Sequence, residues 1–182
     1  MRKIFALTLL ITAIFTCNIA YAVDAWAIHN QYVKQLVKYM EQIARSVKPS
    51  YIGYEYYGPD AEDYDCPEQI YSLVYRNKTS TLVINFYDKN LREMGAWPYF
   101  STTNPAHSIG NIKVGASMNV LKKSTFYKID NSRHYQSFYD GSVINVYYNK
   151  KGIITRIEYR YEEPVADDAM KFINGKVKAN LK

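Results

Sequence analysis

Cysteine is scarce in this chain, which has only 2 among its 182 residues, Cys17 and Cys66. If the N-terminal leader described below is removed on export, Cys66 alone remains, and a single cysteine excludes an internal disulfide framework. Free cysteine is among the residue types most often buried. We therefore expect Cys66 to be a buried thiol, with a bridge to a second molecule as the alternative.

The chain also lacks the motifs of common catalytic sites. It has no glycine-rich phosphate loop, no Gly-x-Ser-x-Gly and no His-x-x-x-His, and its three histidines, His29, His107 and His134, are far apart in the sequence. Its basic residues are scattered rather than gathered into a stripe, which disfavours nucleic-acid binding. We expect no cofactor and no enzymatic activity. A carboxylate pair for sugar cleavage leaves no local signature, so an envelope enzyme stays an alternative.

The first 22 residues have the three regions of a secretory leader. Arg2 and Lys3 are followed by an apolar run from Ile4 to Phe15 and by Ala20-Tyr21-Ala22, a small-x-small cleavage site. The run is shorter than the ~20 residues of a membrane-spanning helix, and no second such run follows. We therefore expect cleavage near Ala22, a protein that is periplasmic or secreted, and no transmembrane segment. Loss of the two basic leader residues lowers the formal net charge from +6 to +4.

Hydrophobic periodicity predicts a long helix near the start of the exported chain. Apolar residues recur at three- and four-residue steps over residues 24–47, and Pro49 ends the pattern. Residues 70–76 and 82–87 alternate as strands do. Residues 88–109 contain Pro98 and Pro105 and are expected to form a long connection.

The C-terminal half has a clearer strand pattern. A Gly115 turn and a short helix capped by Ser117 are expected first. Strands are then predicted at residues 135–139, 143–148 and 153–161, joined by Asp140-Gly141 and Lys151-Gly152 turns. In the last strand, Ile153, Thr155, Ile157, Tyr159 and Tyr161 are assigned to one face and Ile154, Arg156, Glu158 and Arg160 to the other. Pro164 starts a predicted final helix that extends to about Ile173.

These elements predict a single α+β domain, residues 23–182, in which helices pack on one face of an antiparallel meander. The run Ile112-Lys113-Val114-Gly115-Ala116-Ser117, followed by the predicted strands, resembles the repeat of the β-lactamase-inhibitor-protein-like superfamily, which includes the SmpA/OmlA (BamE-type) proteins. The resemblance covers residues 109–162. It implies a non-enzymatic protein-binding module, inhibitor-like or assembly-factor-like, and a possible second repeat would divide the chain into 23–100 and 109–182. A cystatin- or NTF2-like fold is the alternative.

Carboxylates gather in the irregular segment 51–68, and oxygen ligands at alternate positions in a loop suit Ca²⁺. The spacing lacks the glycine and the final glutamate of the known calcium-loop signature, so this site is a weak candidate. An exposed, solvated acidic loop is the alternative. The candidate ligands are Asp60, Glu62, Asp63 and Asp65.

Tyrosine is abundant, with 19 residues, and several aromatic side chains are expected in loops rather than strands. Tyrosine and tryptophan dominate binding hot spots, although loop aromatics also cap the edges of cores. We predict an exported module that binds another envelope or extracellular protein, with a carbohydrate-binding protein or envelope enzyme as the alternative. The candidate contact residues are Trp97, Tyr99, Phe100, Tyr56 and Tyr57.

Overall fold

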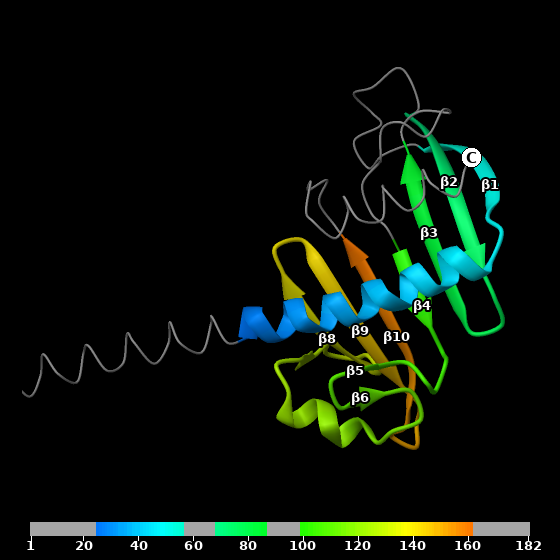
Figure 1. The fold of residues 1–182 in the computed structure, drawn as a ribbon. Helices are drawn as coiled ribbons and strands as arrows, with labels where there is room; N and C mark the ends of the chain where they lie inside the picture. The colour runs from blue at the N-terminus through cyan, green and yellow to red at the C-terminus, as the bar shows by residue number, and fades with distance from the viewer. Residues whose placement is uncertain (1–24, 57–67, 87–98, 162–182) are drawn as a thin grey trace, which may run out of the picture.

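One antiparallel sheet joins the two halves of the chain (Figure 1). The computed structural model describes residues 25–56, 68–86 and 99–161. In spatial order the sheet contains β1 (Ser50–Tyr56), β2 (Glu68–Arg76), β3 (Ser80–Phe86), β4 (Tyr99–Thr102), β10 (Ile154–Tyr161), β9 (Ser142–Tyr148), β8 (His134–Tyr139) and β7 (Tyr127–Lys128). A small hairpin of β5 (Ser108–Ile109) and β6 (Ile112–Lys113) lies apart from this sheet, and η1 (Met118–Lys123) is a short 3-10 helix.

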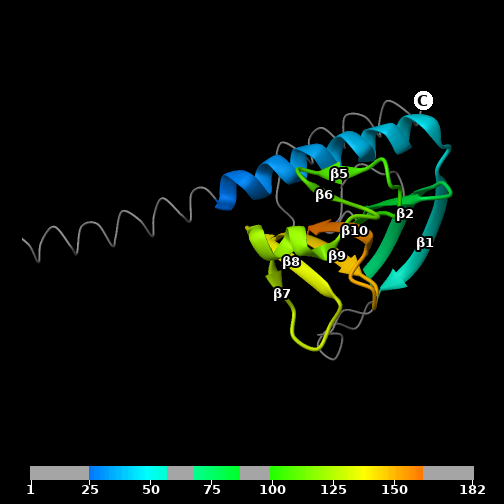
Figure 2. The ribbon, with the colours of Figure 1, turned by 90° about the horizontal axis from the view of Figure 1, so that it is seen from below.

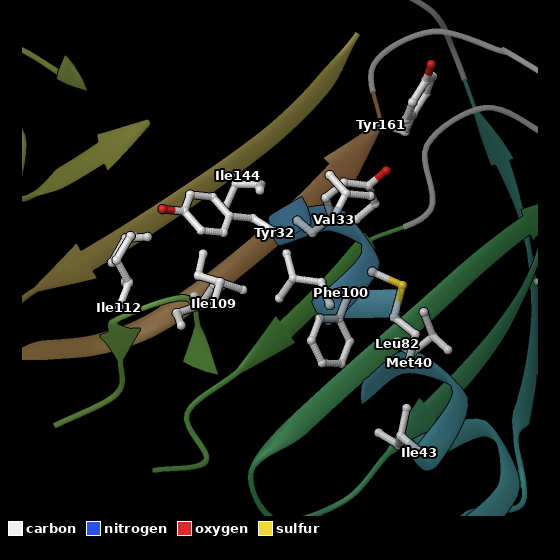
Figure 3. Close-up of a cluster of buried hydrophobic side chains, with 14 of the residues drawn as sticks. Tyr32, Val33, Met40, Ile43, Leu82, Phe100, Ile109, Ile112, Ile144 and Tyr161 are labelled. Carbon is white, nitrogen blue, oxygen red and sulfur yellow. The ribbon is translucent and has the colours of Figure 1, made fainter. Parts of the chain in front are cut away.

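The N-terminal helix, residues 25–46, runs across one face of the sheet (Figures 1 and 2). Its apolar stripe is buried, and Figure 3 shows Met40 and Ile43 near Leu82 of β3. The β5–β6 hairpin packs beside the helix, since the Tyr39 hydroxyl donates to the Ser108 carbonyl at 3.0 Å. The core therefore lies between the helix, this hairpin and the helix-facing side of the sheet.

The predicted fold class is wrong. We expected an α+β domain with helices on one face of a meander. The described residues are instead dominated by an eight-stranded sheet, with one long helix and the short η1. The sheet is not a meander throughout either, because β4 pairs with β10 across a long stretch of sequence. The predicted C-terminal helix lies outside the described residues.

A β-bulge in β10 changes which side chains face the core. The register shifts between Ile154 and Arg156, opposite Tyr147 and Tyr148. The extra residue, Thr155, puts Ile154 on the helix-facing side with Ile157, where both are buried. The sequence-based assignment of Ile154 and Arg156 to a common face was therefore incorrect. Strict alternation holds only from Arg156 onward.

The short helix predicted after Gly115 is observed as the 3-10 helix η1. Ser117 caps it as expected, because its hydroxyl accepts a hydrogen bond from the Asn119 amide. Leu121 is fully buried and anchors this segment in the core. Backbone hydrogen bonds from Gly115 and Met118 to Ile154 and Gly152 tie it to the start of β10.

Gly110 should tolerate a side chain poorly. Its φ is +57°, and an added Cβ would lie 2.9 Å from Cε1 of Tyr32. We expect Gly110→Ala to lower the free energy of unfolding by about 1–3 kcal/mol, from backbone strain and this contact. Gly115→Ala is a matched control, because Gly115 also has a positive φ, +89°, but no atom lies within 4 Å of its added Cβ. Urea unfolding measures the stability of both variants. An equal loss of unfolding free energy in Gly110→Ala and Gly115→Ala would contradict a role for the contact with Tyr32.

Candidate functional site: the outer face of the sheet

The outer face, defined here as the side of the sheet opposite the N-terminal helix, carries a row of polar side chains. The row crosses seven strands through successive register partners. Its members are Tyr127, Gln136, Asn145, Glu158, Ser101, Thr81 and Arg76. The Tyr127 hydroxyl donates to Oε1 of Gln136 at 2.6 Å, and Nε2 of Gln136 donates to Oδ1 of Asn145 at 3.0 Å. These bonds fix one end of the row.

Glu158 is the centre of a second set of contacts on the outer face. The Tyr99 hydroxyl donates to its Oε1 at 2.8 Å, and Nε of Arg156 lies 2.9 Å from the same oxygen. The Nε–H is not aligned for a hydrogen bond, so the contact with Arg156 is an ion pair. Glu158 is 9% exposed, and its charge is therefore balanced locally.

The Arg156 guanidinium also lies over an aromatic ring. Its Cζ is 4.1 Å from the centroid of the Tyr147 ring, and the His134 ring is 5.0 Å from the same ring. Arginine over an aromatic face gains a cation–π attraction. Arg156 shares the outer face with Glu158 by the regular alternation of β10, and the bulge directly before it moves Ile154 to the helix-facing side.

The titratable groups around Glu158 are neutral at neutral pH. Burial is the first cause that raises the pKa of Tyr99 and the pKa of Tyr147, and Glu158 adds to both. Burial likewise lowers the pKa of His134. The charged side chains on this part of β10 are therefore Arg156, Glu158 and Arg160.

The sequence-predicted contact residues fall in different places. Tyr99 lies in β4 rather than in a loop, is partly exposed and contacts Glu158. Phe100 is fully buried on the helix-facing side, so its predicted role at an exposed surface is contradicted by its packing. Tyr56 ends β1, but its side chain lies outside the described residues, as do Trp97 and Tyr57 entirely.

The predicted calcium ligands Asp60, Glu62, Asp63 and Asp65 also lie outside the described residues, as does Cys66. Within residues 25–56, 68–86 and 99–161, no group of three or more histidine, cysteine or acidic side chains is placed to hold a metal ion. In the same part of the chain, no helix has the length and apolarity needed to cross a membrane.

His29 forms a second polar cluster, which is sealed inside the molecule. Its ring is fully buried between two serine hydroxyls, with Nδ1 2.7 Å from Ser137 and Nε2 2.9 Å from Ser142. Burial lowers the pKa of His29 to about 4. A serine beside a histidine is the pairing of an activated nucleophile. Because all three side chains are buried, we assign this cluster to the attachment of the helix to β8 and β9 instead.

Comparisons with known proteins identify no family for this chain. No family model matches it, and no curated protein does. Among solved structures, the crystal structure of a cysteine-rich secretory protein from Staphylococcus aureus matches with 14% identity and a TM-score of 0.33. The match covers 54% of this chain and 38% of that one, so it spans well under two thirds of the staphylococcal protein.

The sequence did not predict that Tyr147, His134 and Arg156 belong to one cluster on the outer face. The polar face of the last strand did contain a signal, because Arg156, Glu158 and Arg160 were assigned together to its solvated side. Their aromatic partners come from β8, β9 and β4, and only the register of the sheet brings them to this place.

Proposed function

We propose that this protein is an exported, non-enzymatic binding protein that recognises another envelope or extracellular protein through the outer face. The observation that carries the proposal is the Arg156 guanidinium held between Glu158 and the Tyr147 ring. Arginine and tyrosine are enriched among the residues that supply most interface energy. The predicted leader supports export, and the resemblance to an inhibitor-like superfamily supports a protein-binding role.

The outer face also has the chemical mixture of a protein interface. Phe138 and Tyr127 are 43% and 49% exposed, large apolar surfaces at its β7–β8 end. Across the sheet from these two side chains toward β4, the next polar residues of the outer face are Asn145 in β9 and Glu158 in β10. Side chains already held by mutual contacts lose less conformational freedom on binding, which favours affinity.

The proposal is tested by capture from an envelope extract on immobilised protein. We expect Tyr127→Ala with Phe138→Ala to reduce capture of a specific protein at least about tenfold, as loss of hot-spot side chains does. Trp26→Ala is the matched control, because Trp26 is 52% exposed but lies on the N-terminal helix. Melting temperatures should show that all variants fold.

Two results would overturn this proposal. Unchanged capture by the double variant, with the captured protein lost in Trp26→Ala, would move the contact surface to the helix. Hydrolysis of peptidoglycan or another polysaccharide by the purified protein would replace a binding role with an enzymatic one.

A further inference from the structure

The solvent-facing side of the N-terminal helix and of the β5–β6 hairpin carries charge of mainly one sign. Figures 1 and 2 show that both segments lie on the same side of the sheet, opposite the outer face. Residues 25–49 and 103–115, which contain them, have five basic side chains and one acidic side chain. We call this surface the helix face. Its basic side chains are all exposed, and they are Lys34, Lys38, Arg45, Lys48 and Lys113.

The fold gathers these charges, which are scattered in the sequence. Lys34, Lys38 and Arg45 are separated by four and seven residues, and a helix brings residues at these spacings to one side. Lys113 alternates with the buried Ile112 in β6, so its side chain leaves the hairpin on the solvent side. The positive charges therefore share one surface above the core.

Few groups on the helix face balance this positive charge. Glu41 is its one acidic residue, and the Glu41 carboxylate lies 3.5 Å from the Arg45 guanidinium. Among the described residues, no ion pair involves any of the four lysines. His29 and His107 add no charge at neutral pH, because burial lowers the pKa of both rings. Five positive charges and one negative charge leave the helix face with a net charge of +4.

We infer that the helix face adsorbs to the surface of an anionic phospholipid membrane. Four of its five basic residues are lysines, which are depleted in protein–protein interfaces but are attracted as compact point charges to an anionic bilayer. These side chains are exposed and spread over two segments, so they suit a continuous array of headgroups better than one bound anion. Trp26 is 52% exposed at the start of the same helix, and tryptophan favours the membrane–water interface.

Adsorption through the helix face is electrostatic and does not require insertion. The apolar stripe of the helix is buried against the sheet, so it is not available to the lipid chains. Each lysine close to an anionic membrane contributes about fivefold to binding, and added salt screens the attraction. The adsorbed protein presents its outer face to solvent, because that face is on the opposite side of the sheet (Figure 2).

Vesicle sedimentation tests the inference on protein recovered after export. We expect the protein to pellet with vesicles that mix phosphatidylglycerol and phosphatidylcholine. It should stay in solution with phosphatidylcholine alone, or with the mixed vesicles in about 1 M salt. Lys34→Gln with Lys38→Gln should lower the partition coefficient about thirtyfold, because two lysines are lost at about fivefold each.

Lys128→Gln with Arg133→Gln is the matched control, since it removes the same charge from exposed residues elsewhere. Both residues belong to β7 and the connection that follows it, which Figure 2 shows on the side of the sheet away from the helix. We expect this variant to bind within about twofold of wild type, because salt screens charges more than a Debye length from the membrane. Glutamine keeps helix propensity close to that of lysine, so the helix variant should fold as wild type does.

Three results would overturn the inference. One is failure to pellet with the phosphatidylglycerol vesicles at low salt. Another is an equal loss of binding in the two double variants, which would assign the attraction to net charge rather than to the helix face. The third is tighter binding to soluble polyphosphate or polyglutamate than to the vesicles, which would replace the membrane by a soluble polyanion. None of them affects partner capture through the outer face, which Lys34→Gln with Lys38→Gln should leave unchanged.

Discussion

Phe100→Ala should lower the free energy of unfolding by about 3–5 kcal/mol, the usual cost of removing a buried aromatic ring. Phe100 is fully buried, with 0% of its surface exposed to solvent. It lies in β4 at the middle of the sheet, between Leu82 of β3 and Tyr159 of β10. Figure 3 shows its ring among the core side chains that face the helix. Helix and sheet cannot both collapse onto the space left by the ring.

Urea unfolding of purified variants measures this loss. Tyr99→Ala is the control from the same strand, because Tyr99 faces the opposite side and is partly exposed. We expect its cost to be clearly smaller. If Phe100→Ala left stability near wild type and instead abolished partner capture, Phe100 would belong to a binding surface and the described packing would be wrong.

Acidification should remove roughly 3 kcal/mol of stability through His29 alone. The folded protein holds this side chain neutral with a pKa of about 4, whereas the ordinary value is 6.5. Between these two values the unfolded chain binds a proton that the folded chain does not, so stability falls as the pH falls. The contribution is complete above pH 6.5, declines from there to about pH 4, and is lost below.

The measurement is urea unfolding at a series of pH values for wild type and His29→Gln. Glutamine retains polar contact with Ser137 and Ser142 but does not titrate, so the variant should show a shallower pH dependence than wild type. His134→Gln serves as the control, because His134 is partly exposed on the outer face. The same slope in wild type and His29→Gln would show that His29 is not buried as a neutral ring.

Local sequence patterns predicted the regular elements well. The helix expected over residues 24–47 is observed over 25–46, and the strand expected over 143–148 is β9, Ser142–Tyr148. Both have sustained periodicity that comes from burying one side against the core. The Ser117 cap was also found, because a cap depends on neighbours a few residues away.

Elements that depend on distant partners were missed. Residues 99–102 follow Pro98 and were assigned to a loop, but β3 and β10 pair with them on both sides and make them a strand. The bulge at Thr155 has no local signature, so simple alternation placed Ile154 on the wrong face. The Arg156 cluster joins side chains of β4, β9 and β10, and its existence depends on that register.

The four-residue strand β4 has a consequence for how the chain reaches its native state. β4 lies between β3 and β10 in the sheet and connects β1–β3 to β7–β10 through its hydrogen bonds. Its pairing with β10 joins residues more than fifty positions apart, such as Tyr99 and Arg160. Such distant pairing carries a loop-closure entropy that slows folding. We therefore expect the two strand groups to form first and β4 to pair with both of them late. Until β4 pairs, the edges of β3 and β10 are open to pairing with other chains. The nascent protein is most exposed to misassembly during that interval.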